Sequence, residues 1–177
     1  ERQLLVSEHA ARMARSLSVV DLTKSDVRPL RDLLAPDVTL QRVQIVEVYR
    51  VVAPGTAGAL SGPLPGLEPV LDVAAPSMPP GYSRAAADRL AAQAFGGSAQ
   101  SSIETVGGGG DFLHAAAVVR SADGKPKGVV VATDYLTGEM AARSRRMTQA
   151  YENYTQLRVL KRPLTGVYLS FFLTVIA

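Results

Sequence analysis

The stretch "FLHAAAVVRSADGKPKGVVVATDYL", residues 112–136, carries the clearest structural signal in this chain. Two runs rich in Val and Ala flank a polar segment that contains Asp123-Gly124, a pair typical of tight hairpin turns. The pattern predicts two antiparallel strands, 112–120 and 127–135. The four glycines at 107–110 predict a second turn, which joins residue 112 to a preceding strand. An antiparallel sheet is therefore expected at the centre of the chain.

Upstream of this hairpin, residues 43–52 ("VQIVEVYRVV") are dense in β-branched residues and predict a strand that is buried on much of both faces. Residues 55–81 are rich in Gly and Pro and predict a long irregular excursion with one short strand near 70–73. "SRAAADRLAAQAFGG" predicts a helix that Ser83 caps and that Gly96-Gly97 ends.

Two long helices are expected to flank this core. In the first, residues 2–20, apolar side chains recur at alternating steps of four and three: Val6, Ala10, Met13, Leu17 and Val20. In the last, residues 137–160, a similar seam is formed by Met140, Arg143, Met147, Ala150, Tyr154 and Leu157. A shorter helix from Asp26, with Pro29 in its first turn, should end before Pro36. The expected fold class is α+β, with a mixed core over 26–136.

The end of the chain changes character at residues 161–163, "KRP", after which no charged residue occurs. A membrane span needs about 20 apolar residues, so 164–177 is shorter than a span. We interpret 161–177 as the start of a transmembrane helix. The alternative is a buried C-terminal helix or strand of a soluble fold.

Composition excludes several classes of protein. A hydrophobic content of 47% excludes a disordered chain, and a net charge of +3 with few aromatic residues disfavours nucleic acid as a partner. The absence of cysteine excludes disulfides, thiolate catalysis and Cys-based zinc sites.

No catalytic motif is recognisable. Gly107 to Gly110 lack the Lys-Ser or Lys-Thr and the following helix of a phosphate-binding loop. The two histidines, His9 and His114, are far apart in the sequence and neither has a second histidine at ligand spacing. We therefore expect no catalytic residue and no metal in this chain.

Polar side chains on or beside the predicted sheet are the candidates for a ligand pocket. Arg50 and Arg84 have the forked guanidinium that holds a carboxylate. The whole set of candidates is Tyr49, Arg50, Tyr82, Arg84, His114, Thr133, Asp134 and Tyr135. The alternative is that the arginines lie on the surface and the tyrosines in the core.

The segment "AYENYTQLRVLKRPLTGVYLSFFLTVIA", residues 150–177, resembles the junction before the second membrane span of NtrY-like nitrogen-regulation sensor histidine kinases. In that family a Tyr-x-x-Tyr-x-x-Leu helix leads into a basic-Pro-x-x-x-Val-Tyr-Leu segment and a Phe-rich span. The matching residues are Tyr151, Tyr154, Leu157, Lys161, Arg162, Pro163, Gly166, Val167, Tyr168, Phe171 and Phe172. The rest of the chain is similar only in element order, to extracytoplasmic sensor domains of the PAS-like or single-Cache type.

The resemblance implies a sensor domain over residues 1–160, on the periplasmic side of the bacterial inner membrane. It would bind a small molecule or sense the membrane state, and pair as a homodimer through its N- and C-terminal helices. Its signalling helix, with Met140, Met147, Tyr154 and Leu157, would act on a cytoplasmic histidine kinase. ATP, Mg²⁺ and a response regulator would engage only that kinase, so this segment should have no enzymatic activity.

Three alternatives remain. The same module could belong to a chemotaxis receptor or a cyclic-dinucleotide enzyme, which share this sensory architecture. It could also be a membrane-tethered structural domain without a ligand, or a soluble enzyme. The basic residues Arg158, Lys161 and Arg162 favour a cytoplasmic side for the domain by the positive-inside tendency, against the periplasmic assignment.

Overall fold

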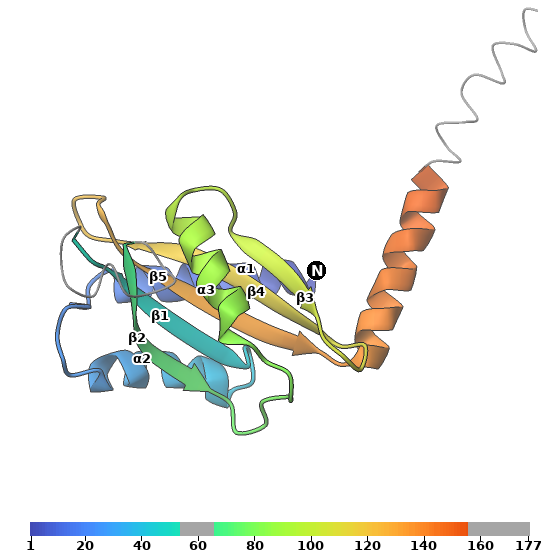
Figure 1. The fold of residues 1–177 in the computed structure, drawn as a ribbon, viewed down its shortest axis with the longest axis horizontal. Helices are drawn as coiled ribbons and strands as arrows, with labels where there is room; N and C mark the ends of the chain where they lie inside the picture. Colours follow the sequence, from blue (N-terminus) through green and yellow to red (C-terminus); the bar gives the residue numbers. More distant parts are fainter. Residues whose placement is uncertain (54–65, 156–177) are drawn as a thin grey trace, which may run out of the picture.

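The computed structural model describes residues 1–53 and 66–155 and shows one sheet with helices on both faces (Figure 1). The elements are α1 (Arg2–Leu17), α2 (Arg28–Thr39), β1 (Ile45–Val51), β2 (Leu67–Ala74), α3 (Arg84–Phe95), β3 (Ser101–Thr105), β4 (Asp111–Arg120) and β5 (Pro126–Leu136). Residues 138–155 form a further helix, which we call the C-terminal helix. The predicted α+β class is confirmed, because helices pack on a five-stranded antiparallel sheet.

The five strands are antiparallel and lie in the order β2-β1-β5-β4-β3. The predicted hairpin forms β4 and β5, and Gly124 in its turn has a φ of 81°, which glycine adopts readily. β5 is central because it pairs with β1 on one side and with β4 on the other. The register aligns Ile45, Thr133 and His114 in one row across the sheet, so these three side chains share a face.

Helices α1 and α2 cover one face of the sheet (Figure 1). The apolar heptad side chains of α1 are buried against the sheet. Those of Val6, Ala10, Met13 and Leu17 are each at most 2% exposed. A helix lying on a sheet needs the same three- and four-residue spacing as a helix in a coiled coil. Any contact of α1 with a second chain would therefore have to use its outer side, where Leu4 is exposed.

Helix α3 covers the opposite face, where its alanines pack on β4 and β5 (Figure 1). Ser83 caps the helix as predicted, because its Oγ accepts a hydrogen bond from the backbone N–H of Ala85 at 3.3 Å. Beyond the C-terminus of the helix, Gly97 has a φ of 75°. The position of α3 brings its N-terminal turn over β1.

One prediction about local structure is wrong, and one expected strand is present but longer than expected. Helix α2 continues through Pro36 to Thr39 instead of ending before the proline. Proline removes one helical hydrogen bond, but Leu34 and Val38 on either side of it are buried in the core, which holds the helix together. The excursion also contains the full-length strand β2, whereas only a short strand near 70–73 was expected. Residues 54–65 of it lie outside the described residues.

The C-terminal helix leaves the end of the sheet directly after β5 and projects away from the domain (Figure 1). Ala141 in its first turn is buried. Arg145 Nη1 donates to Asp111 Oδ2 at 2.6 Å, and its Nη2 donates to the carbonyl oxygen of Gly109 at 3.2 Å. The rest of the predicted 137–160 helix, with Leu157, and the predicted span at 161–177 lie outside the described residues. None of the helices that the structure describes is long and apolar enough to cross a membrane.

Candidate functional site

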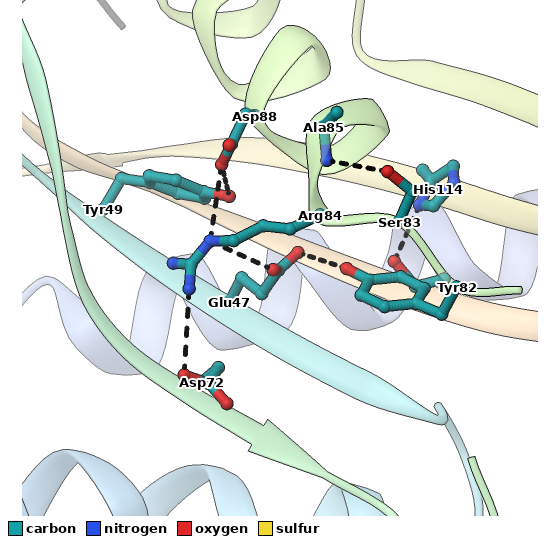
Figure 2. A network of polar contacts seen from close by, with 10 residues as sticks. Glu47, Tyr49, Asp72, Tyr82, Ser83, Arg84, Ala85, Asp88 and His114 are labelled. Carbon is teal, nitrogen blue, oxygen red and sulfur yellow. Dashed lines mark hydrogen bonds and ion pairs between the residues drawn. The ribbon is translucent and has the colours of Figure 1, made fainter. Parts of the chain in front are cut away.

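A cluster of polar side chains lies between the sheet and the N-terminal turn of α3 (Figure 2). Its members come from β1, β2, α3 and the loop that precedes α3. We call it the Glu47–Arg84 cluster, and it consists of Glu47, Tyr49, Asp72, Tyr82, Arg84 and Asp88.

Glu47 is the centre of the cluster and is only 1% exposed. The Tyr82 hydroxyl donates a hydrogen bond to Glu47 Oε2 at 2.7 Å, and Arg84 Nε lies 3.6 Å from Oε1. A buried carboxylate is stable only when such groups compensate for the loss of water. Glu47 therefore ties β1 to both the loop before α3 and the helix itself.

Three carboxylates surround the single guanidinium of Arg84. Besides Glu47, Asp88 Oδ1 lies 3.5 Å from Arg84 Nε, and Asp72 Oδ1 lies 3.9 Å from Nη1. Asp72 stands directly opposite Glu47 on the paired strands, an arrangement of like charges that destabilises a sheet unless a cation intervenes. Arg84 provides that cation.

Tyr49 contacts both Arg84 and Asp88. Its ring centroid lies 5.9 Å from the guanidinium carbon of Arg84, within the range of a cation–π contact. The Tyr49 hydroxyl donates to Asp88 Oδ1 at 2.8 Å. Burial, and then the negative charge of Glu47, raises the pKa of the Tyr49 hydroxyl, so it stays protonated as a donor.

Burial also controls the charge of Glu47. Desolvation raises the pKa of its carboxyl to about 7, although the hydrogen bond from Tyr82 and the charge of Arg84 act in the opposite direction. The carboxyl therefore changes its protonation near neutral pH. The contacts of Glu47 and Arg84 thus connect β1, β2 and α3.

His114 lies next to the cluster and is fully buried. Its Nδ1 is hydrogen-bonded to Thr133 Oγ1 at 2.8 Å, and its Nε2 lies 3.5 Å from Glu104 Oε2. Burial lowers the pKa of His114, which favours the neutral ring. Its ring centroid is 6.4 Å from that of Tyr82.

The structure brings most of the predicted ligand residues to one face of the sheet. Tyr49, Tyr82 and Arg84 meet in the cluster, and His114 with Thr133 lies beside it. Tyr135 is on the same face, because it pairs with Phe112 at the end of β5 and β4.

Arg50 and Asp134 lie apart from this group, on the other face. Arg50 forms an ion pair with Glu68 of β2 at 2.6 Å. Asp134 is 4% exposed, and its Oδ2 lies 3.4 Å from Arg2 Nη1 at the start of α1. Burial raises the pKa of Asp134. Both residues hold secondary structure together away from the cluster.

Sequence reasoning missed the acidic members of the cluster, above all Glu47. A signal was present in the segment "VQIVEVYRV", because Glu47 is the one acid in a strand that was expected to be buried on both faces. Asp72 and Asp88 gave no such signal, since each lies in a segment with exposed positions.

Clefts also occur away from the cluster, and three of them have walls that include neither Glu47 nor Tyr82 nor His114. One of about 620 Å³ separates the start of α1 from the C-terminal helix, with Gln3, Ile103 and Arg145 on its walls. The others measure about 300 and 410 Å³. The first lies beside Lys127, and the second lies along the end of β4, with residues of both α1 and α3 on its walls. Within residues 1–53 and 66–155, no group of three or more acidic or histidine side chains is placed to hold a metal ion.

The predicted signalling residues of the C-terminal helix are exposed. Met140 is 50% exposed, Met147 68% and Tyr154 65%. They recur every seven residues along the helix. Beyond Arg145, this seam has no cover from the domain in the part of the chain that the structure describes.

Comparison with known proteins gives little further information. No family model and no curated protein matches the chain. The crystal structure of the periplasmic sensory domain of the Campylobacter jejuni chemoreceptor Tlp1 is similar, with a TM-score of 0.37 and 12% sequence identity. The similarity covers 75% of this chain and 51% of that chain, so this chain spans about half the length of that neighbour. A likeness at this level says nothing about ligand or activity.

Proposed function

We propose that this chain is the signal-sensing extracytoplasmic domain of a membrane-bound two-component sensor histidine kinase. The observation that carries the proposal is the C-terminal helix. Within the described residues it is fixed to the sheet at its base, by Ala141 and Arg145, and then projects with the large apolar side chains of Met147 and Tyr154 exposed. A helix built in this way suits the transmission of a change in the domain to whatever follows it.

The partner of the seam is a second copy of this chain. Met140, Met147 and Tyr154 occupy equivalent positions of successive heptads, as in a parallel coiled coil. Each of these large side chains gains about 1.5–3 kcal/mol when it passes from full exposure to burial, and somewhat less from its present exposure. Two such helices form a bundle whose packing a signal can shift or rotate.

The Glu47–Arg84 cluster is the input of this sensor. It joins β1, β2 and α3 through a carboxyl that changes charge near neutral pH. A small molecule with a carboxylate or an amine would compete with these internal ion pairs. ATP, Mg²⁺ and the response regulator belong to a kinase domain elsewhere in the protein, and this chain itself catalyses no reaction.

The location of the domain is tested with a topology reporter. Alkaline phosphatase, which is active only outside the cytoplasm, is inserted in the intact protein after Asp123 in the exposed β4–β5 turn. Activity of the reporter supports the periplasmic assignment. Inactivity, with an active fluorescent protein at the same position, would place the domain in the cytoplasm and overturn it.

The output is tested with the intact protein in membrane vesicles. Incorporation of phosphate from labelled ATP into a histidine, followed by transfer to an aspartate of a response regulator, supports the kinase assignment. A protein that carries no such activity, and instead controls a kinase in trans or makes a cyclic dinucleotide, would show that the module serves a chemoreceptor or a nucleotide cyclase.

A further inference from the structure

The turn formed by the four glycines at 107–110 supports the start of the C-terminal helix. A Cβ added to Gly138, next to the helix start, would lie 3.0 Å from the carbonyl oxygen of Gly108 and 3.5 Å from that of Gly109. Gly108 and Gly109 themselves have positive φ values of 109° and 87°. The helix therefore rests on the turn by backbone-to-backbone contact. We call Gly107 to Gly110, together with Gly138, the glycine seat.

An aromatic ring fills the remaining side of this seat. A Cβ added to Gly110 would overlap the Tyr135 hydroxyl oxygen and would lie 2.6 Å from its Cζ. The Tyr135 ring thus occupies the space that any side chain at position 110 would need. Because the ring lies against the backbone at Gly110, a shift of the ring or of the turn alters this contact.

The same ring is linked to the Glu47–Arg84 cluster by two further aromatic side chains. The ring centroid of Phe112 is 5.0 Å from that of Tyr135, and that of Tyr82 is 5.4 Å from Phe112 in an edge-to-face arrangement. Both separations are within the range of favourable aromatic contacts. The Tyr82 hydroxyl in turn donates to Glu47. Phe112 is fully buried, so the series is enclosed at its middle.

We propose that Tyr82, Phe112 and Tyr135 form an aromatic relay that transmits changes at the Glu47–Arg84 cluster to the glycine seat, and thereby reorients the C-terminal helix. This inference rests on the proposed function. When Glu47 loses its charge or a ligand withdraws Arg84, the Tyr82 hydroxyl changes its partner and the ring shifts. Phe112 and Tyr135 follow, and the turn displaces Gly138 while the ion pair between Arg145 and Asp111 keeps the helix attached. A series of contacts is shown to be a pathway only when energetic coupling between its two ends, here Glu47 and the C-terminal helix, is measured.

The chain contains no cysteine. Two introduced cysteines can therefore be spin-labelled without labelling at any other position. Arg31→Cys on α2 and Arg146→Cys on the C-terminal helix are both exposed positions. Pulsed electron paramagnetic resonance on the whole 177-residue chain gives the distance distribution between them. We expect Glu47→Gln to move this distribution by about 1–2 Å, the size of helix shifts in known switches. Glu139→Gln, which removes an exposed charge, should leave it unchanged.

The relay is then interrupted in two independent ways, by Phe112→Leu and by Tyr135→Leu, so that one folding failure does not end the test. The relay predicts that Glu47→Gln shifts the distance at most half as far in the Phe112→Leu or Tyr135→Leu protein as it does in the otherwise unchanged chain, provided that the variant is folded. Gly138→Ala should shift the distance in both backgrounds, because it acts at the seat itself. Gly96→Ala, at the C-terminal end of α3, is the matched control, because its φ of −77° suits alanine and an added Cβ would lie no closer than 3.5 Å to the nearest atom.

Two results would overturn the relay. One is an undiminished effect of Glu47→Gln when Phe112 or Tyr135 is replaced, and the other is no effect of Glu47→Gln in any background. Neither result bears on the periplasmic reporter or on phosphorylation of the intact protein. The relay and the proposed function can therefore fail separately.

Discussion

At the scale of single residues, Glu47 is the most unusual position of this protein. Its carboxyl is almost fully buried in a strand between valines, where an apolar side chain would be more stable at neutral pH. The contacts from Tyr82 and Arg84 reduce this penalty without removing it, because the pKa of Glu47 is still raised. Such a position is typical of a functional site.

The raised pKa predicts how stability depends on pH. In the unfolded chain Glu47 titrates near 4.5, and in the folded chain near 7. Between these values the folded state binds more protons, so the free energy of unfolding falls as pH rises from 4.5 to 7 and this contribution is lost above pH 7. The loss is at most ~3 kcal/mol. As the pH rises from about 5 to about 8, the free energy of unfolding should therefore fall less in Glu47→Gln than in the wild type.

Urea unfolding at the two pH values measures this difference, with Glu139→Gln as the control for the loss of an exposed charge. Equal losses in the wild type and in Glu47→Gln would show that Glu47 titrates outside this range.

Tyr82→Phe tests the hydrogen bond to Glu47 Oε2. At pH 8 the ionised carboxylate loses a donor, and the free energy of unfolding should fall by about 1.5–3 kcal/mol. At pH 5 the loss should be smaller, because a protonated carboxyl needs fewer donors. Chemical denaturation checks both values, and Tyr151→Phe on the exposed part of the C-terminal helix should change neither. A loss that is the same at both pH values would exclude a role of the Glu47 charge.

At the scale of secondary structure elements, α1 shows that a heptad pattern does not by itself indicate a coiled coil. Its seam is covered by the sheet and not by a partner helix. Leu17→Ala should lower the free energy of unfolding by about 2–5 kcal/mol, because the side chain is fully buried. Leu4→Ala on the same helix, 70% exposed, should change it by less than about 0.5 kcal/mol.

Thermal unfolding at two protein concentrations is the measurement. If the effect of Leu17→Ala depended on concentration, the seam would be an interface between chains, contrary to the fold described here.

The elements themselves were largely predictable from the sequence, since their signals are local. The hairpin follows from Asp123-Gly124 between two apolar runs, and α3 follows from Ser83 and the alanines after it. Helix α2 was predicted too short because burial of Leu34 and Val38 outweighs the effect of Pro36, and burial is a tertiary property.

The site was only partly predictable, since it depends on register. Tyr49, Tyr82 and Arg84 were identified by residue type. Their grouping around Glu47 depends on Asp72 standing opposite it and on the packing angle of α3, which no local pattern encodes. Arg50 was chosen together with Tyr49, yet adjacent residues of a strand point to opposite faces, and it pairs with Glu68 instead.

At the scale of the whole molecule, the C-terminal helix projects from the domain (Figure 1). The two are joined at the glycine seat and at the ion pair between Arg145 and Asp111. The chain starts near this joint as well, where Arg2 pairs with Asp134 at the end of β5. Both ends of the domain are thus anchored to the same end of the sheet.

The exposed seam predicts association of two chains. Met147→Asp places a charge in the middle of the seam and should weaken the dimer at least about tenfold, which corresponds to ~1.4 kcal/mol. Gln149→Asp, on the same helix but off the seam, should have little effect. Sedimentation equilibrium of the 177-residue chain in detergent measures both. A dimer that is as tight with Met147→Asp as without it would require an interface elsewhere.

Autophosphorylation of the intact protein in membrane vesicles tests the central claim most directly, with wild type, Glu47→Gln and Glu139→Gln compared at one pH. A sensor whose input is the buried Glu47 carboxyl should change its phosphorylation level by about threefold or more when Glu47 becomes a neutral amide, because the balance of two packings is shifted. Glu139→Gln should match the wild type. Equal phosphorylation in all three proteins would contradict the assignment of the Glu47–Arg84 cluster as the signal input.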